Sequence, residues 1–450
     1  MKNPGLPRRQ GHRRTAVTAS VLLLPLAVST LSACSDDDGA TNPPPTASPA
    51  ATASGARCVT DRPADDKGPD AKPRAKAAYT VDDKTVKAKS HKEFKTTKRD
   101  ESALLVSGSG KLTTRDAKII KHGGTSSLTA SDGHGLNAAA LARDGGTLTM
   151  SGGRMSTQDK GSIGVFAAGK DAKATLSSGG IRTHGASAHG VAAAHGGTLD
   201  LTYVEIDTAA AQAAPVAVGP GGGKVTVSGG TMTSAGCGSP GVQTEGDVSL
   251  SQTLFDLANS EAFTVEAGGS LSLKDVRASA AAGGVVLRGD GDGDTSYRMT
   301  GGAVQASDGD IFAVQQADAD IELSGGADVK TKDGKLLRVT DKGTAKFRAN
   351  GEKLKGSVAV TKGSSATLDL TGSTDLDGKI VGAASLTLGP RTQWSVSGDS
   401  ALKGLKLADG AKVSDVIVGN GHTVTYDKAS SPDLHGKKFQ LEGGGTLKPA

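Results

Sequence analysis

The run with the most obvious chemistry in this chain alternates glycine and aspartate after an arginine, over residues 288–294. Its carboxylates stand at every second position, the spacing at which calcium-binding loops present their ligands. The sixth and twelfth positions of such a loop are usually glycine and glutamate but are Thr295 and Gly301 here. We expect a solvated turn, and its candidate calcium ligands are Asp290, Asp292 and Asp294.

The same run opens with the tripeptide Arg288-Gly289-Asp290, a sequence that animal integrins recognise. Exposed turns favour glycine and aspartate in any case, so the tripeptide alone is weak support for recognition. We keep Arg288, Gly289 and Asp290 as a candidate recognition loop beside the simpler interpretation of a surface turn.

Histidines gather in one part of the chain but do not form a metal-binding motif. No His-Glu-x-x-His or paired-cysteine pattern accompanies them, so we expect small polar turn residues and no zinc. These histidines are His122, His134, His184, His189 and His195.

Cys34 is a candidate lipidation site. A cationic start is followed by an apolar run from Ala16 to Leu31 and small residues, as in a secretory signal. That run is shorter than the ~20 residues that span a bilayer. Leu31-Ser32-Ala33-Cys34 resembles the lipobox of bacterial lipoproteins, in which the cysteine takes a diacylglyceryl group and becomes the mature N-terminus. We therefore expect export and anchoring in the cell membrane through this lipid, facing the extracellular or periplasmic side.

The other two cysteines are Cys58 and Cys237. Export would permit a disulfide between them, but Cys58 lies in a segment that reads as a linker, and two lone cysteines do not make a disulfide scaffold. The sequence leaves open whether they are bridged.

Catalytic patterns are absent from the sequence. A β-helical polysaccharide lyase or hydrolase needs clustered or paired aspartates and stacking aromatics, yet four Tyr, seven Phe and one Trp are scattered along the chain. No Gly-x-Ser-x-Gly elbow marks an acyl-transfer nucleophile. We expect no enzyme activity and no cofactor other than the candidate calcium.

Charge argues against a nucleic-acid partner. Once residues 1–33 are removed, 47 basic and 47 acidic residues remain, because the signal holds five cations and no acid. One basic stretch, Lys67–Arg99, has eleven Lys/Arg against four Asp/Glu. We interpret it as a solvated arm; an arm that contacts anionic wall polymer or lipid headgroups is the alternative.

The strands that would position these residues repeat along the chain. Segments with apolar residues two apart recur, and Ser-Gly-Gly or Thr-Gly-Gly often follows them. The first glycines of these pairs are Gly152, Gly179, Gly229, Gly301 and Gly325. From each of these glycines to the next, the separation is one, two, three and one repeats of about 24–27 residues. The skipped places are Val204, Gln252 and Lys274-Asp275, which also end alternating runs.

A second signal keeps the same period. Segments such as His134-Gly135-Leu136, Ile163-Gly164-Val165 and His189-Gly190-Val191 step by 25 to 29 residues. A repeat of this length with short strands and no helical stretch predicts one turn of a parallel β-helix, because leucine-rich repeats need a signature absent here and propeller blades are longer. At ~25 residues per coil, the chain from Ser102 onward gives roughly 14 coils, stacked about 4.8 Å apart.

A family resemblance is carried most specifically by Leu386–Ser400, the apolar residues that follow it, and the ending Leu441–Leu447. On these residues and its repeat, the chain resembles the right-handed β-helix passengers of the pertactin-like autotransporter family. This resemblance implies a stable C-terminal cap over residues 393–450. No series of alternating ~10-residue strands for an outer-membrane barrel follows, so we expect that the translocator is lacking and that the lipid is the anchor.

The sequence therefore predicts an all-β protein, a right-handed single-stranded parallel β-helix preceded by a tether. The expected divisions are a signal at 1–33, a linker arm at 34–100, coils at 101–392 and a cap at 393–450. We expect a monomeric surface lipoprotein without catalysis, an adhesin or cell-envelope interaction protein whose partners are the membrane and a glycan, matrix or envelope polymer. A carbohydrate-active enzyme and a structural spacer are the alternatives.

Overall fold

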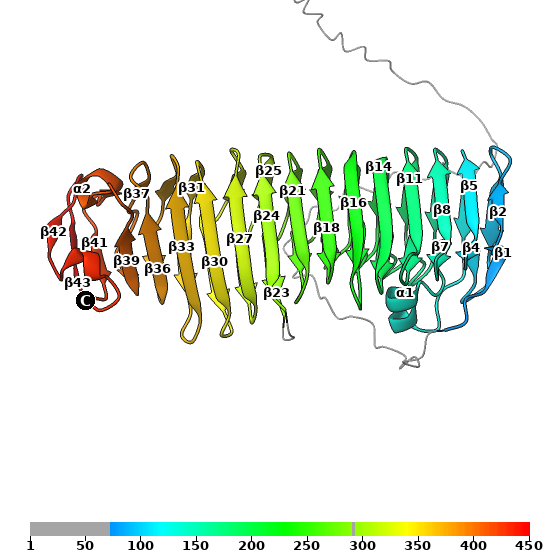
Figure 1. The fold of residues 1–450 in the computed structure, drawn as a ribbon, viewed down its shortest axis with the longest axis horizontal. Coiled ribbons are helices and arrows are strands. Elements are labelled where there is room, and N and C mark those ends of the chain that lie inside the picture. Colours follow the sequence, from blue (N-terminus) through cyan, green and yellow to red (C-terminus); the bar gives the residue numbers. More distant parts are fainter. Residues whose placement is uncertain (1–72, 290–292) are drawn as a thin grey trace, which may run out of the picture. The chain divides into compact units, whose positions relative to one another are not determined.

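A computed structural model describes residues 73–289 and 293–450, which wind into a parallel β-solenoid of about 15 turns (Figure 1). The all-β class and the stacked coils that we predicted are confirmed. Most turns contribute three short strands, and each strand pairs in parallel with its counterparts in the turns before and after it. Cys34, Asp290 and Asp292 lie outside the described residues.

The first strand of each turn belongs to a 13-stranded sheet, sheet A. Its members are β1 (Ala77–Asp82), β4 (Ser102–Ser107), β7 (Ala140–Arg143), β10 (Val165–Ala168), β13 (Val191–Ala194), β15 (Val216–Val218), β17 (Val242–Thr244), β20 (Glu261–Val265), β23 (Gly283–Arg288), β26 (Phe312–Gln315), β29 (Lys335–Thr340), β32 (Ser357–Val360) and β35 (Ile380–Val381).

The second strand of each turn forms one column of the 22-stranded sheet B. This column contains β2 (Thr85–Lys87), β5 (Lys111–Arg115), β8 (Thr147–Ser151), β11 (Lys173–Ser177), β14 (Gly197–Thr208), β16 (Gly223–Ser234), β18 (Asp247–Ser251), β21 (Ser270–Lys274), β24 (Thr295–Thr300), β27 (Asp318–Ser324), β30 (Thr344–Asn350), β33 (Ser365–Thr371), β36 (Ala384–Leu388) and β39 (Gly404–Leu407).

The third strands complete sheet B and continue as a four-stranded sheet C, while β14 and β16 are long enough to enter both columns of sheet B. In sheet B they are β3 (Glu93–Thr96), β6 (Lys118–Lys121), β9 (Arg154–Thr157), β12 (Gly180–Thr183), β19 (Leu254–Leu257), β22 (Arg277–Ala280), β25 (Ala303–Ala306) and β28 (Asp328–Thr331). In sheet C they are β31 (Lys353–Lys355), β34 (Asp375–Asp377), β37 (Gln393–Ser395) and β40 (Ile417–Val418).

The core is built from inward side chains that stack in register from turn to turn. Successive strands of the middle column place Leu148, Ala174 and Leu199 on neighbouring positions, and the same line continues to Leu405. Strand residues alternate between the two faces of a sheet, so every second residue enters this interior. Each turn therefore needs the turns beside it to complete the burial of its apolar face.

The predicted glycine corners are confirmed. Gly152 and Gly153, between β8 and β9, have φ of 64° and 93°, a region that favours glycine. Where the glycine pair is skipped, a non-glycine residue takes the left-handed backbone instead, as Gln252 and Asp275 do. In the third skipped place this residue is Tyr203, one position before the Val204 we identified.

The solenoid begins earlier than predicted. We placed a linker arm over residues 34–100, but β1, β2 and β3 lie within it and pair with β4, β5 and β6 of the next turn. The boundary was wrong because the high lysine content hides the alternation: in β3, Phe94 and Thr96 are buried while Glu93 and Lys95 point outward. The remainder of the proposed arm, up to residue 72, lies outside the described residues.

A helix and a second apolar cluster were not predicted. Helix α1 (Leu128–His134) begins at Ser127, whose side chain accepts a hydrogen bond from the Ala130 amide, and ends at Gly135, with φ of 68°. Leu141 and Phe166 stack on the outer face of sheet A, and an added Cβ at Gly135 would lie within 3 Å of both. The helix thus ends against an apolar patch outside the solenoid interior. Within the described ranges, no helix is sufficiently long and apolar to cross a bilayer.

The C-terminal end departs from the plain coil. Here β38 (Ser400–Leu402), β41 (Thr423–Tyr426) and β43 (Thr446–Pro449) are parallel, and β42 (Phe439–Gln440) folds back antiparallel to β43. Two short helical turns, α2 (Val413–Val416) and η1 (Pro432–Leu434), interrupt this part. These elements lie within the segment that we predicted as a cap.

Lys121, at the end of β6, is a buried cation near the start of the solenoid. Its side chain is fully buried, and Nζ donates to the carbonyl oxygens of Lys98 (3.1 Å), His122 and Gly123. Burial lowers the pKa of Lys121 from 10.5 to about 8, although nearby carboxylates, led by Asp159, oppose the shift.

The unfolding free energy should therefore rise with pH above about 8. Between about 8 and roughly 10.4, the unfolded chain holds a proton on Lys121 that the folded chain releases, so alkalinisation favours the folded state. We expect a gain of about 3 kcal/mol, measured by urea unfolding across this pH range. Lys121→Met should remove this gain, and the control Lys95→Met, at an exposed position of β3, should keep it. An unchanged pH slope in Lys121→Met would contradict the assignment.

Candidate functional site

The acidic run lies at the turn between β23 and β24. Arg288 is the last residue of β23, and Asp294 directly precedes β24. Asp290 and Asp292, the other candidate calcium ligands, lie outside the described residues. The structure thus places Arg288, Gly289 and Asp294 from the two predicted motifs.

The arginine of the candidate recognition loop is engaged within the protein. Its Nε lies 3.1 and 3.0 Å from the two carboxylate oxygens of Glu266, and Nη2 lies 2.9 Å from Oε1. The hydrogen bond to Glu266 raises the pKa of Arg288 above its ordinary value, with burial opposing it. A partner that recognises Arg288 would have to replace its charge-assisted hydrogen bonds to the Glu266 carboxylate.

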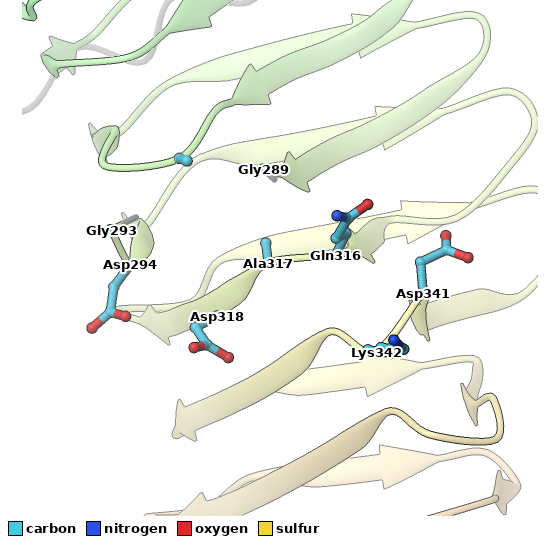
Figure 2. Close-up of a pocket in the computed structure, with 9 residues that line it drawn as sticks. Gly289, Gly293, Asp294, Gln316, Ala317, Asp318, Asp341 and Lys342 are labelled. Carbon is cyan, nitrogen blue, oxygen red and sulfur yellow. The ribbon is translucent and has the colours of Figure 1, made fainter. Parts of the chain in front are cut away.

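A hollow of about 550 Å³ opens beside the run, and Figure 2 shows its lining side chains. Asp294 and Asp318 stand one residue before the paired positions Thr295 and Ala319 of β24 and β27, so two carboxylates occupy equivalent places on neighbouring turns. Lys342 lines the same hollow from the following turn.

Backbone geometry explains two of the glycines here. An added Cβ at Gly289 would lie 2.5 Å from the Cβ of Ala267, and Gly293 has φ of 127°. The first position needs glycine for close approach and the second for its conformation. These glycines therefore serve the turn itself, whether or not the run binds a ligand.

No group of three or more metal-ligating side chains comes together among residues 73–289 and 293–450. Asp294 is the only predicted calcium ligand among the described residues, so calcium binding at the run stays a proposal.

The predicted histidines make separate contacts. The rings of His134 and His195 stack with their centroids 4.8 Å apart, and Nδ1 of His184 lies 3.0 Å from the Thr157 carbonyl oxygen.

A second hollow, of about 690 Å³, runs along the outer face of sheet A beside α1. Its lining includes Asp132, Glu245 and Glu261, so it carries acidic groups on several turns. His189 faces Asp132, with Nε2 4.0 Å from Oδ1, while its Nδ1 accepts a hydrogen bond from the Ala214 amide. This hollow was not predicted from the sequence, because helix α1, which contributes Thr129 and Asp132 to its wall, was not predicted either.

Cys237 is held in a disulfide bond. The two other cysteines, Cys34 and Cys58, lie outside the described residues. Cys237 is therefore not a free thiol, and whether its partner is Cys58, as the sequence left open, is a question about residues outside the described part of the chain.

The outward residues of the middle column form a regular polar surface, which we call the hydroxyl face. Side chains in register on successive turns are Ser or Thr at most positions, and they are at least partly exposed. The members are Thr149, Ser151, Thr175, Ser177, Thr202, Thr226, Ser228, Ser249, Ser251 and Ser272. Neighbouring turns place these hydroxyls about 4.8 Å apart along the solenoid.

Tyr203 stands at the border of the hydroxyl face and was missed in the sequence. It is 65% exposed, and its φ of 51° is unusual for a bulky residue. An added Cβ at Gly229 of the next turn would lie 2.5 Å from the Tyr203 ring, so the ring lies over this glycine. The available signal was a tyrosine at the corner where other turns carry glycine.

Comparison with known proteins supports the fold. No family model matches the chain. The chain is similar to the BrkA autotransporter of Bordetella pertussis, with 27% identity over 332 residues, 65% of this chain and 30% of that protein. The chain therefore spans well under half the length of this relative. Similarity and stacked coils together fit a pertactin-like β-helix, of the kind that our sequence comparison implied.

Removal of one carboxylate from the neighbouring pair tests the electrostatics of the first hollow. Asp294→Asn should raise the unfolding free energy by about 0.2–0.5 kcal/mol at low salt, because like charges on adjacent strands repel. The gain should fade in high salt. Asp341→Asn, in the same hollow, serves as the control and should give no such gain.

Bound calcium would reverse the effect of Asp294→Asn on the unfolding free energy. If the ion bridges the pair, millimolar calcium should stabilise the wild-type chain more than Asp294→Asn in the same thermal unfolding experiment. Identical curves with and without calcium would exclude a bridging ion at Asp294.

Proposed function

We propose that this chain is a lipid-anchored, surface-displayed β-helix protein that binds a glycan and does not catalyse a reaction. The observation that carries the proposal is its similarity to the BrkA autotransporter together with the stacked parallel coils. Autotransporter similarity suggests a cell-surface or envelope location. The lipobox-like sequence at Cys34 supports a lipid as the anchor.

The hydroxyl face supports a glycan as partner. Hydroxyl groups both donate and accept hydrogen bonds, as the hydroxyls of a sugar do. The row Ser177, Thr202, Ser228 and Ser251 offers this chemistry on four consecutive turns. An extended polymer of repeating units can contact such a surface at many equivalent points, each one weak.

Tyr203 supplies an aromatic ring beside these hydroxyls. Most large aromatic side chains described, among them Trp394, Tyr297 and Phe347, are fully buried in the solenoid. Tyr203 instead presents its ring to solvent at a strained corner, and strained, exposed residues are found at binding sites more often than elsewhere. A sugar ring stacked on Tyr203 would place its hydroxyls towards Thr202 and Ser228.

A glycan array tests this with the mature chain. We expect retention of an envelope or matrix glycan and a loss of roughly five- to tenfold for Tyr203→Ala, the size of one aromatic contact. Leu254→Ala, which removes the other large exposed apolar side chain described, is the matched control and should bind normally. Equal retention by both variants would contradict a role for Tyr203.

The carbohydrate-active alternative rests on Asp294 and Asp318, two carboxylates at equivalent places in one hollow. Such a pair is the requirement of acid–base hydrolysis of a glycosidic bond. Release of shortened glycan products in the same assay, abolished by Asp318→Asn, would favour that alternative. Retention without product would favour binding alone.

The anchor is tested by labelling cells with an alkyne-bearing fatty acid. We expect the wild-type chain to take up the label and to sediment with membranes. Cys34→Ser should lose the label completely, because the thiol is the acceptor. Cys58→Ser should keep it, which controls for nonspecific loss of a cysteine, and a label that persists in Cys34→Ser would contradict the lipoprotein assignment.

A further inference from the structure

The first two turns of the solenoid carry a concentrated positive charge. Residues 73–121 contain 13 Lys/Arg against 6 Asp/Glu, whereas residues 122–450 contain 30 against 34. Six of the 13 cations lie on strands β2, β3, β5 and β6, and the others lie on the turns and flanking residues of these strands, at the N-terminal end of the stack (Figure 1). The charge is therefore a fixed surface feature of one end.

Several of these cations have no acidic partner. Lys98 and Lys118 pair with Glu101 and Glu93. In contrast, among the residues that the structure describes, no carboxylate is in ion-pair contact with the exposed side chains of Lys84, Lys87, Lys89 and Lys95.

Apolar side chains at the same end are incompletely covered. Among the described residues, β1, β2 and β3 pair only with β4, β5 and β6, so they form the first layer of the described stack. Tyr79, Val86 and Ala88 pack on the core but remain partly exposed. The Lys92 ammonium lies 4.0 Å from the centre of the Tyr79 ring and 5.1 Å from that of Phe94, so a cation lies directly on this layer.

We infer that this end, the basic end, binds anionic phospholipid headgroups at a membrane surface. An anionic bilayer attracts lysines and also accepts apolar side chains at its interface. A hydrophilic wall polymer would satisfy the lysines but offer nothing to Tyr79, Val86 and Ala88. A second copy of this end is disfavoured because both copies carry the same charge, and lysines on edge strands oppose edge-to-edge pairing.

The inference rests on the proposed lipid anchor for its location. Acylation at Cys34 would attach the chain to a membrane 39 residues before Pro73, the first described residue. The anchored protein would then have its basic end within reach of headgroups. Lipid binding by the basic end is, however, a separate property that can be measured without the acyl chain.

Vesicle sedimentation of the mature chain with Cys34→Ser tests the inference without the anchor. We expect binding to vesicles of phosphatidylglycerol and phosphatidylcholine, weakening as salt rises, and little binding to phosphatidylcholine alone. The variant K84Q/K87Q/K89Q/K95Q should bind the anionic vesicles at least about tenfold more weakly. The control K428Q/K437Q/K438Q/K448Q removes four exposed lysines from the opposite end and should bind like the parent.

Circular dichroism and light scattering show whether each variant is folded and monomeric. Equal binding to both vesicle types, or an equal loss in the control variant, would overturn the inference. A parent chain that binds neither vesicle type would also overturn the inference. If the first variant then dimerises, the lysines serve only to prevent edge-to-edge pairing. Labelling of Cys34 and glycan retention are independent of these outcomes, so the proposed function can stand while this inference fails.

Discussion

The structure depends on one constraint: an inward side chain is fully covered only when the turns above and below it are in place. Leu148 is covered by the residues in register above and below it, and the same holds for Leu271 and Ile321 further along. The free energy of burial is thus shared between neighbouring turns, and the fold extends as long as the register is kept. A turn that lost its register would expose its own interior and that of both neighbours.

The same constraint organises the outside of the molecule. Since inward residues align from turn to turn, the outward residues between them must align as well, and surface features become rows along the stack. The hydroxyl face is such a row, and Asp294 with Asp318 is a shorter one. Tyr203 is conspicuous for its size: at the same corner, Gly152 and Gly229 adopt this backbone conformation at no steric cost, and Gln252 and Asp275 adopt it without an aromatic ring.

The repeat made most of the fold predictable from sequence, because alternation and glycine corners are local signals of strands and turns. Features outside the repeat were not predictable in this way. Helix α1 had Ser127 and Gly135 as cap signals, but seven residues between strands are too few to show helical periodicity. In β7 and β10 both faces are buried, one of them against an outer cluster, so these strands do not alternate. Arg288 and the Asp294 turn were found by motif, whereas the Glu266 contact needed the register of two turns.

In a solenoid, only the first and last layers lack a neighbouring turn to pair with their strands and cover their apolar side chains. The two ends of the described stack differ in how they deal with this. At the C-terminal end, β42 folds back on β43 and Leu447 is fully buried, so the last layer is closed by backbone pairing. At the N-terminal end of the described stack, β1 to β3 pair with described strands on one side only, and the layer that holds Tyr79 is bordered by lysines. Charge keeps an open edge from pairing with another chain without covering it. The positively charged N-terminal layer can therefore still bind a partner, whereas the closed C-terminal layer cannot. Its charge and its apolar side chains both favour an anionic interface as that partner.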